Sequence, residues 1–195
     1  MIETFTQRKN PRLQGYDYSL AGGYFVTICA CKRGDVFGMI EGEEMVLNKI
    51  GEMAQLCWLE IPSHFQMVEL DAFIVMPDHF HGIIFLTESD EGAGLVPARY
   101  GQTETTTVSR ATTRVAPTLG RIIGSFKSIS TNRYFSGVRD QAWPAIEKKL
   151  WRRGCYDRII RNDEELEYIR NYVMHNAIKQ EPPVFFSEAY YETRT

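Results

Sequence analysis

The chain has 195 residues, of which 44% are hydrophobic and 12% aromatic, and this composition suits one domain with a buried core. No apolar run approaches the roughly 20 residues of a membrane span, and the polar first residues show no signal-peptide pattern, so we expect a cytoplasmic protein with no membrane partner. The net charge of −3 does not suggest a nucleic-acid ligand, and the four cysteines match neither a zinc knuckle nor a redox pair, so we expect reduced, mostly buried thiols.

The first half of the chain predicts three strands and one helix. Aromatic and β-branched residues over 22–31 (GGYFVTICAC) are typical of a strand, and the KRGDVFG that follows is typical of a turn. Apolar residues recur at helical spacing over about 46–64. Two further strands are predicted at 68–76 and 79–86, and they should pair as an antiparallel hairpin because only a short break separates them.

The second half begins with an irregular stretch. Residues 88–116 are rich in Gly, Thr, Ser and charge without a period, which indicates a mobile insertion. An amphipathic helix is predicted over 117–135, and a strand over 150–160 with a turn possible at Gly154. A last helix (NDEELEYIRNYVMHNA) should begin at Asn162, whose side chain can cap its first turn.

The order of these elements is β-α-β-β-(insertion)-α-β-α. Such an order predicts an α+β fold with an antiparallel, ferredoxin-like (RRM-like) sheet and helices packed on one face.

Charge is distributed unevenly along the chain. Residues 120–161 include ten basic and three acidic residues, a net charge of +7, so the rest of the chain carries −10. A basic zone on an acidic protein fits a localised site for a polyanion, and a solvated surface of mixed charge is the plain alternative.

The stretch VMPDHFHGII places two of the chain's four histidines, His79 and His81, two residues apart in a predicted strand. Residues i and i+2 of a strand point to the same face, so the two imidazoles lie side by side while Phe80 points into the opposite layer. Two imidazoles so placed can chelate one divalent ion and leave positions for a substrate oxygen and water. By itself, an HxH pair is more often two ordinary strand-surface histidines.

The stretch VMPDHFHGIIFL resembles the histidine–hydrophobic–histidine signature of the HUH endonucleases. More narrowly, it resembles the single-tyrosine transposases, in which Met-Pro-Asp or Met-Pro-Asn leads into the histidine pair. YFVTICACKRGDVFG resembles that family's first strand and turn, LGRIIGSFKSISTNRY its basic helix, and LWRRGCYDRIIRNDEELEYIRNYVMHN the strand and nucleophile helix of the REP-associated branch. The four blocks stand in family order, and the resemblance implies one HUH transposase domain over 1–195.

The resemblance also implies a nucleophile, Tyr172, and a third metal ligand, Asn176, beside His79 and His81. Residues four apart share a helix face, which agrees with this assignment. An amide oxygen beside two imidazoles suits Mg²⁺ or Mn²⁺ better than a closed zinc site.

Three nearby residues leave alternatives open. Ala177 follows the asparagine where the family usually has proline. Tyr168 stands one turn before the expected nucleophile, a spacing that some HUH replication initiators use. His175 is close enough in sequence to compete as a metal ligand.

The activity that the resemblance implies is cleavage and rejoining of single-stranded, hairpin-containing DNA of a transposable or repeated element, through a 5′-phosphotyrosine intermediate. The basic residues expected to follow the phosphates are Arg121, Lys127, Arg133, Arg152, Arg153 and Arg158. Trp151 or Tyr156 could stack on a base. Relatives act either as monomers or as homodimers that exchange the tyrosine helix, and both states stay open here.

Three other functions remain compatible with the sequence. One is a non-catalytic nucleic-acid-binding module on a ferredoxin-like sheet, which would use the basic zone and no metal. Another is a metal-dependent hydrolase that activates water, for which Asp78 is the obvious acid–base candidate. The third is a rolling-circle replication initiator-type nickase, which the pair of tyrosines would serve.

Overall fold

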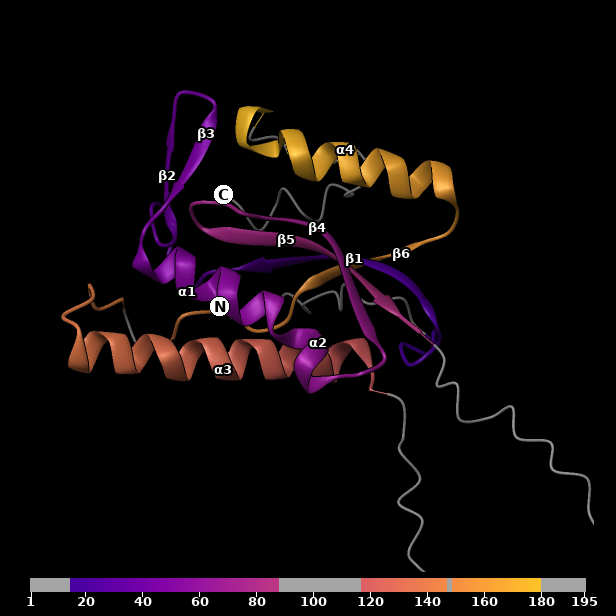
Figure 1. The fold of residues 1–195 in the computed structure, drawn as a ribbon, viewed down its shortest axis with the longest axis horizontal. Helices are drawn as coiled ribbons and strands as arrows, with labels where there is room; N and C mark the ends of the chain where they lie inside the picture. Colours follow the sequence, from indigo (N-terminus) through magenta and orange to yellow (C-terminus); the bar gives the residue numbers. More distant parts are fainter. Residues whose placement is uncertain (1–14, 88–116, 147–148, 180–195) are drawn as a thin grey trace, which may run out of the picture.

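The computed structural model describes residues 15–87, 117–146 and 149–179, without the side chains of 176–179. Its strands are β1 (Gly22–Cys29), β2 (Gly38–Glu41), β3 (Glu44–Leu47), β4 (Val68–Val75), β5 (His79–Leu86) and β6 (Tyr156–Ile160). Its helices are α1 (Lys49–Leu59), α2 (Ile61–His64), α3 (Leu119–Asp140) and α4 (Asp163–Lys179) (Figure 1). The insertion predicted at 88–116 lies outside the described residues.

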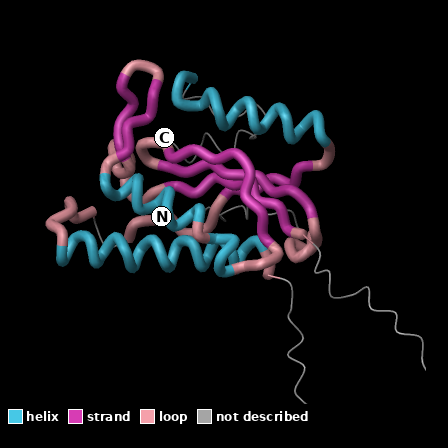
Figure 2. Tube along the Cα trace, viewed as in Figure 1, coloured by secondary structure: helices cyan, strands magenta, loops and turns pink. Residues whose placement is uncertain are grey.

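Four strands form one sheet in the order β4-β5-β1-β6, and every neighbouring pair is antiparallel. Helices α1 and α3 lie on one side of this sheet and α4 lies on the other (Figure 1; Figure 2). The arrangement confirms the predicted α+β class, with an antiparallel ferredoxin-like sheet and helices packed on it. The expectation that the helices share one face was wrong, because the central strands are apolar on both faces and each face needs a cover.

Strand β1 shows how the two faces are built. Tyr24, Val26 and Ile28 point into the larger hydrophobic core, beneath α1 and α3. Phe25 points the other way, into a smaller core that includes Ile169 of α4. Alternating side chains of one strand therefore contribute to two separate cores.

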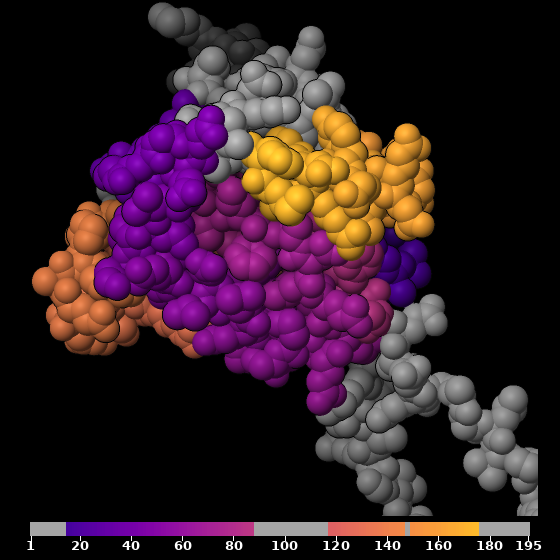
Figure 3. Space-filling view, turned by 45° about the horizontal axis from the view of Figure 1, so that its top comes forward, coloured from indigo at the N-terminus to yellow at the C-terminus, as the bar shows by residue number. Residues whose placement is uncertain are grey.

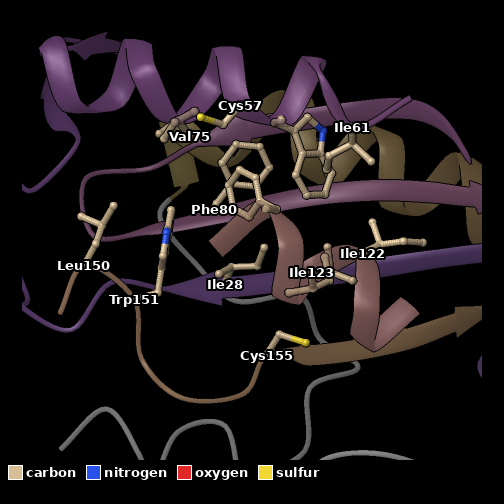
Figure 4. Packing of buried hydrophobic residues seen from close by; sticks show 14 of the residues in the cluster. Ile28, Cys57, Ile61, Val75, Phe80, Ile122, Ile123, Leu150, Trp151 and Cys155 are labelled. Atoms are coloured by element: carbon tan, nitrogen blue, oxygen red, sulfur yellow. The ribbon is translucent and has the colours of Figure 1, made fainter. Parts of the chain in front are cut away.

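Aromatic rings fill the larger core, part of which Figure 4 shows around Phe80. The fully buried Trp58 ring lies 4.6 Å from the Phe80 ring and 5.4 Å from the Phe126 ring, centroid to centroid. Gly82 of β5 makes room for this indole, since a Cβ at that position would lie 2.3 Å from Cζ2 of Trp58.

The helix predicted over 46–64 begins too early. The first two residues of that prediction belong to strand β3, which ends at Leu47 and pairs with β2 in a separate two-stranded sheet. Helix α1 begins after Asn48, whose side chain accepts hydrogen bonds from the backbone N–H groups of Ile50 and Gly51. Val46 matches the helical spacing by coincidence, because a four-residue strand is too short to show a period of its own.

Other predicted boundaries also needed correction. The strand predicted over 22–31 ends at Cys29, and α3 runs to Asp140 rather than to 135. The strand predicted over 150–160 is confined to its second half, because Gly154 turns the chain with a φ of +80°.

The start of α4 agrees with the prediction. The backbone N–H of Glu165 donates to the Asn162 side chain over 2.8 Å, so Asn162 caps the helix. The Glu165 carboxylate accepts from the backbone N–H of Arg161, one residue before the position that a regular capping box would use.

None of the four cysteines, all within the described residues, forms a disulfide; Cys57 and Cys155 are buried, Cys29 is half-buried and Cys31 is exposed. None of the helices in the described ranges combines the length and the apolarity that crossing a bilayer requires.

Candidate active site

The two histidines of the HxH motif lie at the start of β5, on the face of the sheet that α4 covers. His81 lies opposite Thr27 of β1, and its ring stacks on Phe25 with centroids 5.4 Å apart. Phe80, between the histidines, points into the larger core. His81 is fully buried and His79 is 7% exposed. The side-by-side placement expected from the strand period is therefore present.

Each imidazole is held through its Nδ1 atom. Nδ1 of His79 lies 2.7 Å from a carboxylate oxygen of Asp78, and Nδ1 of His81 lies 2.8 Å from the hydroxyl of Thr27. These contacts turn the two Nε2 atoms toward each other, at a separation of 3.1 Å. Hydrogen bonds to the remote ring nitrogen are the usual means of orienting histidines that bind metals.

The partners restrict where the ring protons lie. A carboxylate only accepts hydrogen bonds, so the Nδ1–H of His79 donates to Asp78 and its Nε2 keeps a lone pair. The Thr27 hydroxyl can donate or accept, which allows two tautomers of His81. In one, Nε2–H of His81 donates to His79; in the other, two lone pairs face each other, an arrangement that either a shared proton or a metal ion would stabilise.

The second tautomer fits a divalent cation. The two Nε2 atoms are 3.1 Å apart, so one divalent ion could contact both, and imidazole nitrogen is a usual ligand for such ions. Among the side chains that the structure describes, no group of three or more His, Cys, Asp or Glu residues could hold a metal ion. The third predicted ligand, Asn176, lies in α4, but its side chain is outside the described part of the chain.

Tyr172 of α4 reaches the histidine pair from above the sheet. Its hydroxyl lies 3.2 Å from Nε2 of His81. Its ring stands edge-on to those of His81 and Phe25, with centroid distances of 5.4 and 6.0 Å. The fold therefore brings the predicted nucleophile and both predicted histidine ligands together.

The two rival residues on α4 lie differently. Tyr168, one turn earlier, is 46% exposed. The exposed ring of His175 turns back on its own helix, where Nδ1 donates to the carbonyl of Asn171 over 2.8 Å. Of these side chains, the half-buried Tyr172 is the one whose hydroxyl meets His81.

Two ion pairs tie α4 to the sheet on either side of this site. Arg170 grips both carboxylate oxygens of Asp71 in β4, with Nε 3.0 Å from Oδ1. The hydrogen bond from Arg170 lowers the pKa of Asp71 below its usual range. In the first turn of the helix, Glu165 pairs with Arg158 of β6. The helix that carries Tyr172 is thus anchored to both edge strands.

A protein of Haemophilus influenzae, described only as uncharacterized, is 33% identical over 173 residues, which cover 88% of either chain. The chain belongs to the family of this Haemophilus protein. No family model matches the sequence.

Two of the solved structures that resemble this protein in fold share little sequence with it. One is a REP-associated tyrosine transposase bound to a REP hairpin, with 16% identity, a TM-score of 0.49, and coverage of 87% of this chain and 73% of that one. The other, from Deinococcus radiodurans, is described as a candidate transposase, with 15% identity, a TM-score of 0.42, and coverage of 84% and 95%.

Two residues of the site have roles that the sequence alone does not predict. Thr27 faces His81 only through the register of β1 against β5, which no local pattern reveals. The sequence suggests Asp78 only as an acid–base group for a hydrolase, whereas in the structure its carboxylate holds the His79 ring. Its position next to the motif was the one available signal.

The predicted DNA-binding residues are scattered over three parts of the fold. On α3, Arg121 is exposed, whereas Arg133 pairs with Glu60 over 2.7 Å. Arg158 lies on β6 and is engaged with α4 through Glu165. Their contacts with DNA stay a prediction.

The remaining basic residues gather where α3 passes the segment before β6. The Lys127 ammonium donates to the backbone carbonyls of Arg152, over 2.9 Å, and Gly154. Burial lowers the pKa of Lys127. Arg152 is half-buried and Arg153 exposed.

The two aromatic candidates for base stacking differ in accessibility. Trp151 is buried, lies 4.9 Å from the Phe37 ring, and donates its indole N–H to Ser130 over 2.8 Å. This indole serves packing. Tyr156 is half-buried and lies opposite Thr27, so it shares the sheet face of the histidine pair.

Proposed function

We propose that the protein is a metal-dependent endonuclease and strand transferase for single-stranded DNA, in which Tyr172 is the nucleophile. The observation that carries the proposal is the meeting of the Tyr172 hydroxyl with the paired imidazoles, 3.2 Å from Nε2 of His81, which is itself 3.1 Å from Nε2 of His79. The HUH-like motif VMPDHFH and the tyrosine helix, read from the sequence, are the two elements that meet at this point.

The chemistry follows from the residues that converge. The Tyr172 oxygen attacks the phosphorus of a phosphodiester, an O–P bond forms, and the bond to the 3′ oxygen breaks. The products are a 5′-phosphotyrosine and a free 3′-hydroxyl, which takes up the proton that the tyrosine loses. Attack by another 3′-hydroxyl reverses the step and joins strands, so no nucleotide energy source is needed.

His79, His81 and Asn176 would hold the cation, Mg²⁺ or Mn²⁺. When bound, it would polarise a non-bridging phosphate oxygen and favour the charge of the transition state. Asp78 and Thr27 keep the imidazoles turned toward the common point. Arg170 and Arg158 hold α4, and with it the tyrosine, over that point.

We propose that one chain contains the whole site, since Tyr172 meets His81 of its own chain. A mixing experiment tests this. A chain with both His79→Ala and His81→Ala is combined with a Tyr172→Phe chain, each inactive alone. A mixture that stays inactive supports a site within one chain, whereas restored cleavage shows that two chains exchange the tyrosine helix.

The substrate we expect is hairpin-containing single-stranded DNA, and the genomic DNA that flanks the gene supplies the oligonucleotides. Strands labelled on the 3′ side of the expected nick are incubated with the protein and Mn²⁺, then separated on denaturing gels. Labelled DNA that co-migrates with protein, and that Tyr172→Phe and chelator both abolish, supports the proposal. Free labelled product from both proteins would indicate a hydrolase that uses water, and binding without any cleavage would indicate a non-catalytic module.

A further inference from the structure

A pocket of about 300 Å³ opens between α3 and the segment that leads into β6. Its described lining includes three cationic side chains, two hydroxyls and one amide, and no carboxylate: Lys127, Lys149, Arg152, Ser128, Thr131 and Asn132. Figure 4 shows the neighbouring apolar residues Leu150 and Trp151 of the same segment. Such a lining offers hydrogen-bond donors and positive charge, the requirements for binding a phosphate group.

The pocket is fixed in shape by contacts within the protein. The Lys127 ammonium donates to two backbone carbonyls of the 149–155 segment and so joins the helix wall to the loop wall. A lysine has three N–H donors, so one remains for a ligand. Thr131 and Asn132 lie three and four residues after Ser128 on α3, so both share with it the face toward the pocket.

The pocket and the candidate active site lie at the same end of β1, on opposite faces of the sheet. The backbone N–H of Arg152 donates to the carbonyl of Cys29, and Cys29 is in register with His79. Adjacent strands are about 4.8 Å apart, so the backbones of Arg152 and His79 are separated by roughly 10 Å. Helix α3 and the histidine pair lie on opposite faces of the sheet, so a DNA strand that contacts both would pass around the end of β1.

We propose that this pocket binds a backbone phosphate of the single-stranded DNA, across the end of the sheet from the phosphate that reacts. The inference rests on the proposed function and deepens it, since it gives the substrate a second anchoring point that does not depend on metal or on Tyr172. The ligand is recognised by charge and hydroxyl donors rather than by base edges, so its binding is independent of DNA sequence.

The test measures binding of fluorescently labelled dT12 by anisotropy, in chelator so that no cleavage occurs, over a range of NaCl concentrations. Lys149→Gln and Arg152→Gln should each weaken binding several-fold and reduce the salt slope by about 0.7 for one lost phosphate contact. Arg139→Gln is the matched control, since Arg139 is exposed on the same helix but outside the pocket. An equal loss in Arg139→Gln would show that general surface charge binds the DNA and would overturn the pocket.

A substitution that fills the pocket without changing charge distinguishes binding in the pocket from binding to a basic surface. Thr131→Met fills the pocket without altering charge and should also weaken dT12 binding, whereas Ser136→Met, on the same helix outside this pocket, should not. Thermal melting checks that each variant folds, and Ser128→Met at an exposed position replaces Thr131→Met if that variant does not. Wild-type affinity in the filled variants would overturn the inference.

Two further outcomes are distinguishable. Failure of wild-type protein to bind dT12 would overturn the pocket alone, because the proposed function rests on hairpin DNA; failure to bind hairpin DNA as well would remove both. Inorganic phosphate that shifts the amide resonances of Ser128 and Thr131 in a protein that binds no dT12 would identify a site for a free anion instead.

Discussion

The hydroxyl of Tyr172 lies 3.2 Å from Nε2 of His81, although 91 residues separate them in the chain. One comes from a helix above the sheet and the other from a central strand within it. The contact therefore exists only when α4 is seated on the sheet, and it links the stability of that packing to the proposed chemistry. In Figure 3, α4 and the β2–β3 hairpin stand on either side of the magenta surface of the sheet.

We predict that His79 and His81 together bind one Mn²⁺ or Mg²⁺ ion. Calorimetric titration of Mn²⁺ into wild-type protein should show one site, which the double alanine variant loses. His175→Ala is the matched control, because that ring is exposed and bonded to its own helix, and it should bind as the wild type does. Equal Mn²⁺ binding by the wild type and the double variant would contradict the assignment.

We expect the hydrogen bond between the Thr27 hydroxyl and His81 to contribute to both stability and Mn²⁺ affinity. Thr27→Val keeps the shape of the side chain but removes that bond from a fully buried imidazole, at a cost of about 1–3 kcal/mol in the free energy of unfolding. Mn²⁺ affinity should fall by about 10–100-fold, the usual effect of losing a partner that orients a ligand. Thr27→Ser keeps the hydroxyl and should retain most of the affinity; the same loss in both variants would point to packing instead.

The Asp71–Arg170 pair should give α4 a stability that depends on pH. The folded state lowers the pKa of Asp71, so the contribution is complete above the unfolded value of about 3.9 and is lost as pH falls through the lower folded-state pKa. Because the pair is partly exposed, we expect Asp71→Asn to cost about 1 kcal/mol or less at pH 7, a difference that should disappear in acid.

Denaturant unfolding at several pH values measures this difference. Asp140→Asn, which breaks an exposed pair with Arg139, should have little effect at any pH. A cost of Asp71→Asn that stays constant down to pH 2 would mean that the carboxylate charge is not the cause.

Two glycine substitutions should have opposite effects. In Gly82→Ala, the new methyl group would lie 2.3 Å from the buried Trp58 ring, so overpacking should destabilise the protein by about 1–3 kcal/mol. In Gly124→Ala, on the exposed side of α3, the methyl group meets open space, and the helix should gain up to about 1 kcal/mol. Thermal melting of both variants measures these effects. A Gly82→Ala protein as stable as the wild type would show that Trp58 packs differently.

Local patterns in the sequence were enough for the parts of the site that one element defines. The shared face of His79 and His81 follows from the period of a single strand, and Asn162 as a cap follows from the residues beside it. Thr27 and His81 are 54 positions apart in the chain, and their contact depends on the register of β1 against β5, which no single segment specifies.

The position of α4 was predictable in part. The run Tyr24, Phe25, Val26 is apolar without alternation, which is typical of a strand buried on both faces, and it called for a second cover on the sheet. Which helix provides that cover is a matter of tertiary packing. The β2–β3 hairpin was missed because its strands are only four residues long.

The most direct test of the account is the chemical location of the covalent bond. Protein incubated with cleavable hairpin DNA and Mn²⁺ is digested, and the peptide that carries a 5′-phosphorylated nucleotide is sequenced by mass spectrometry. We predict that the modification lies on Tyr172 and that Tyr172→Phe forms no adduct while still folding and binding DNA. An adduct on Tyr168, or cleavage without an adduct in any variant, would contradict the assignment of the nucleophile.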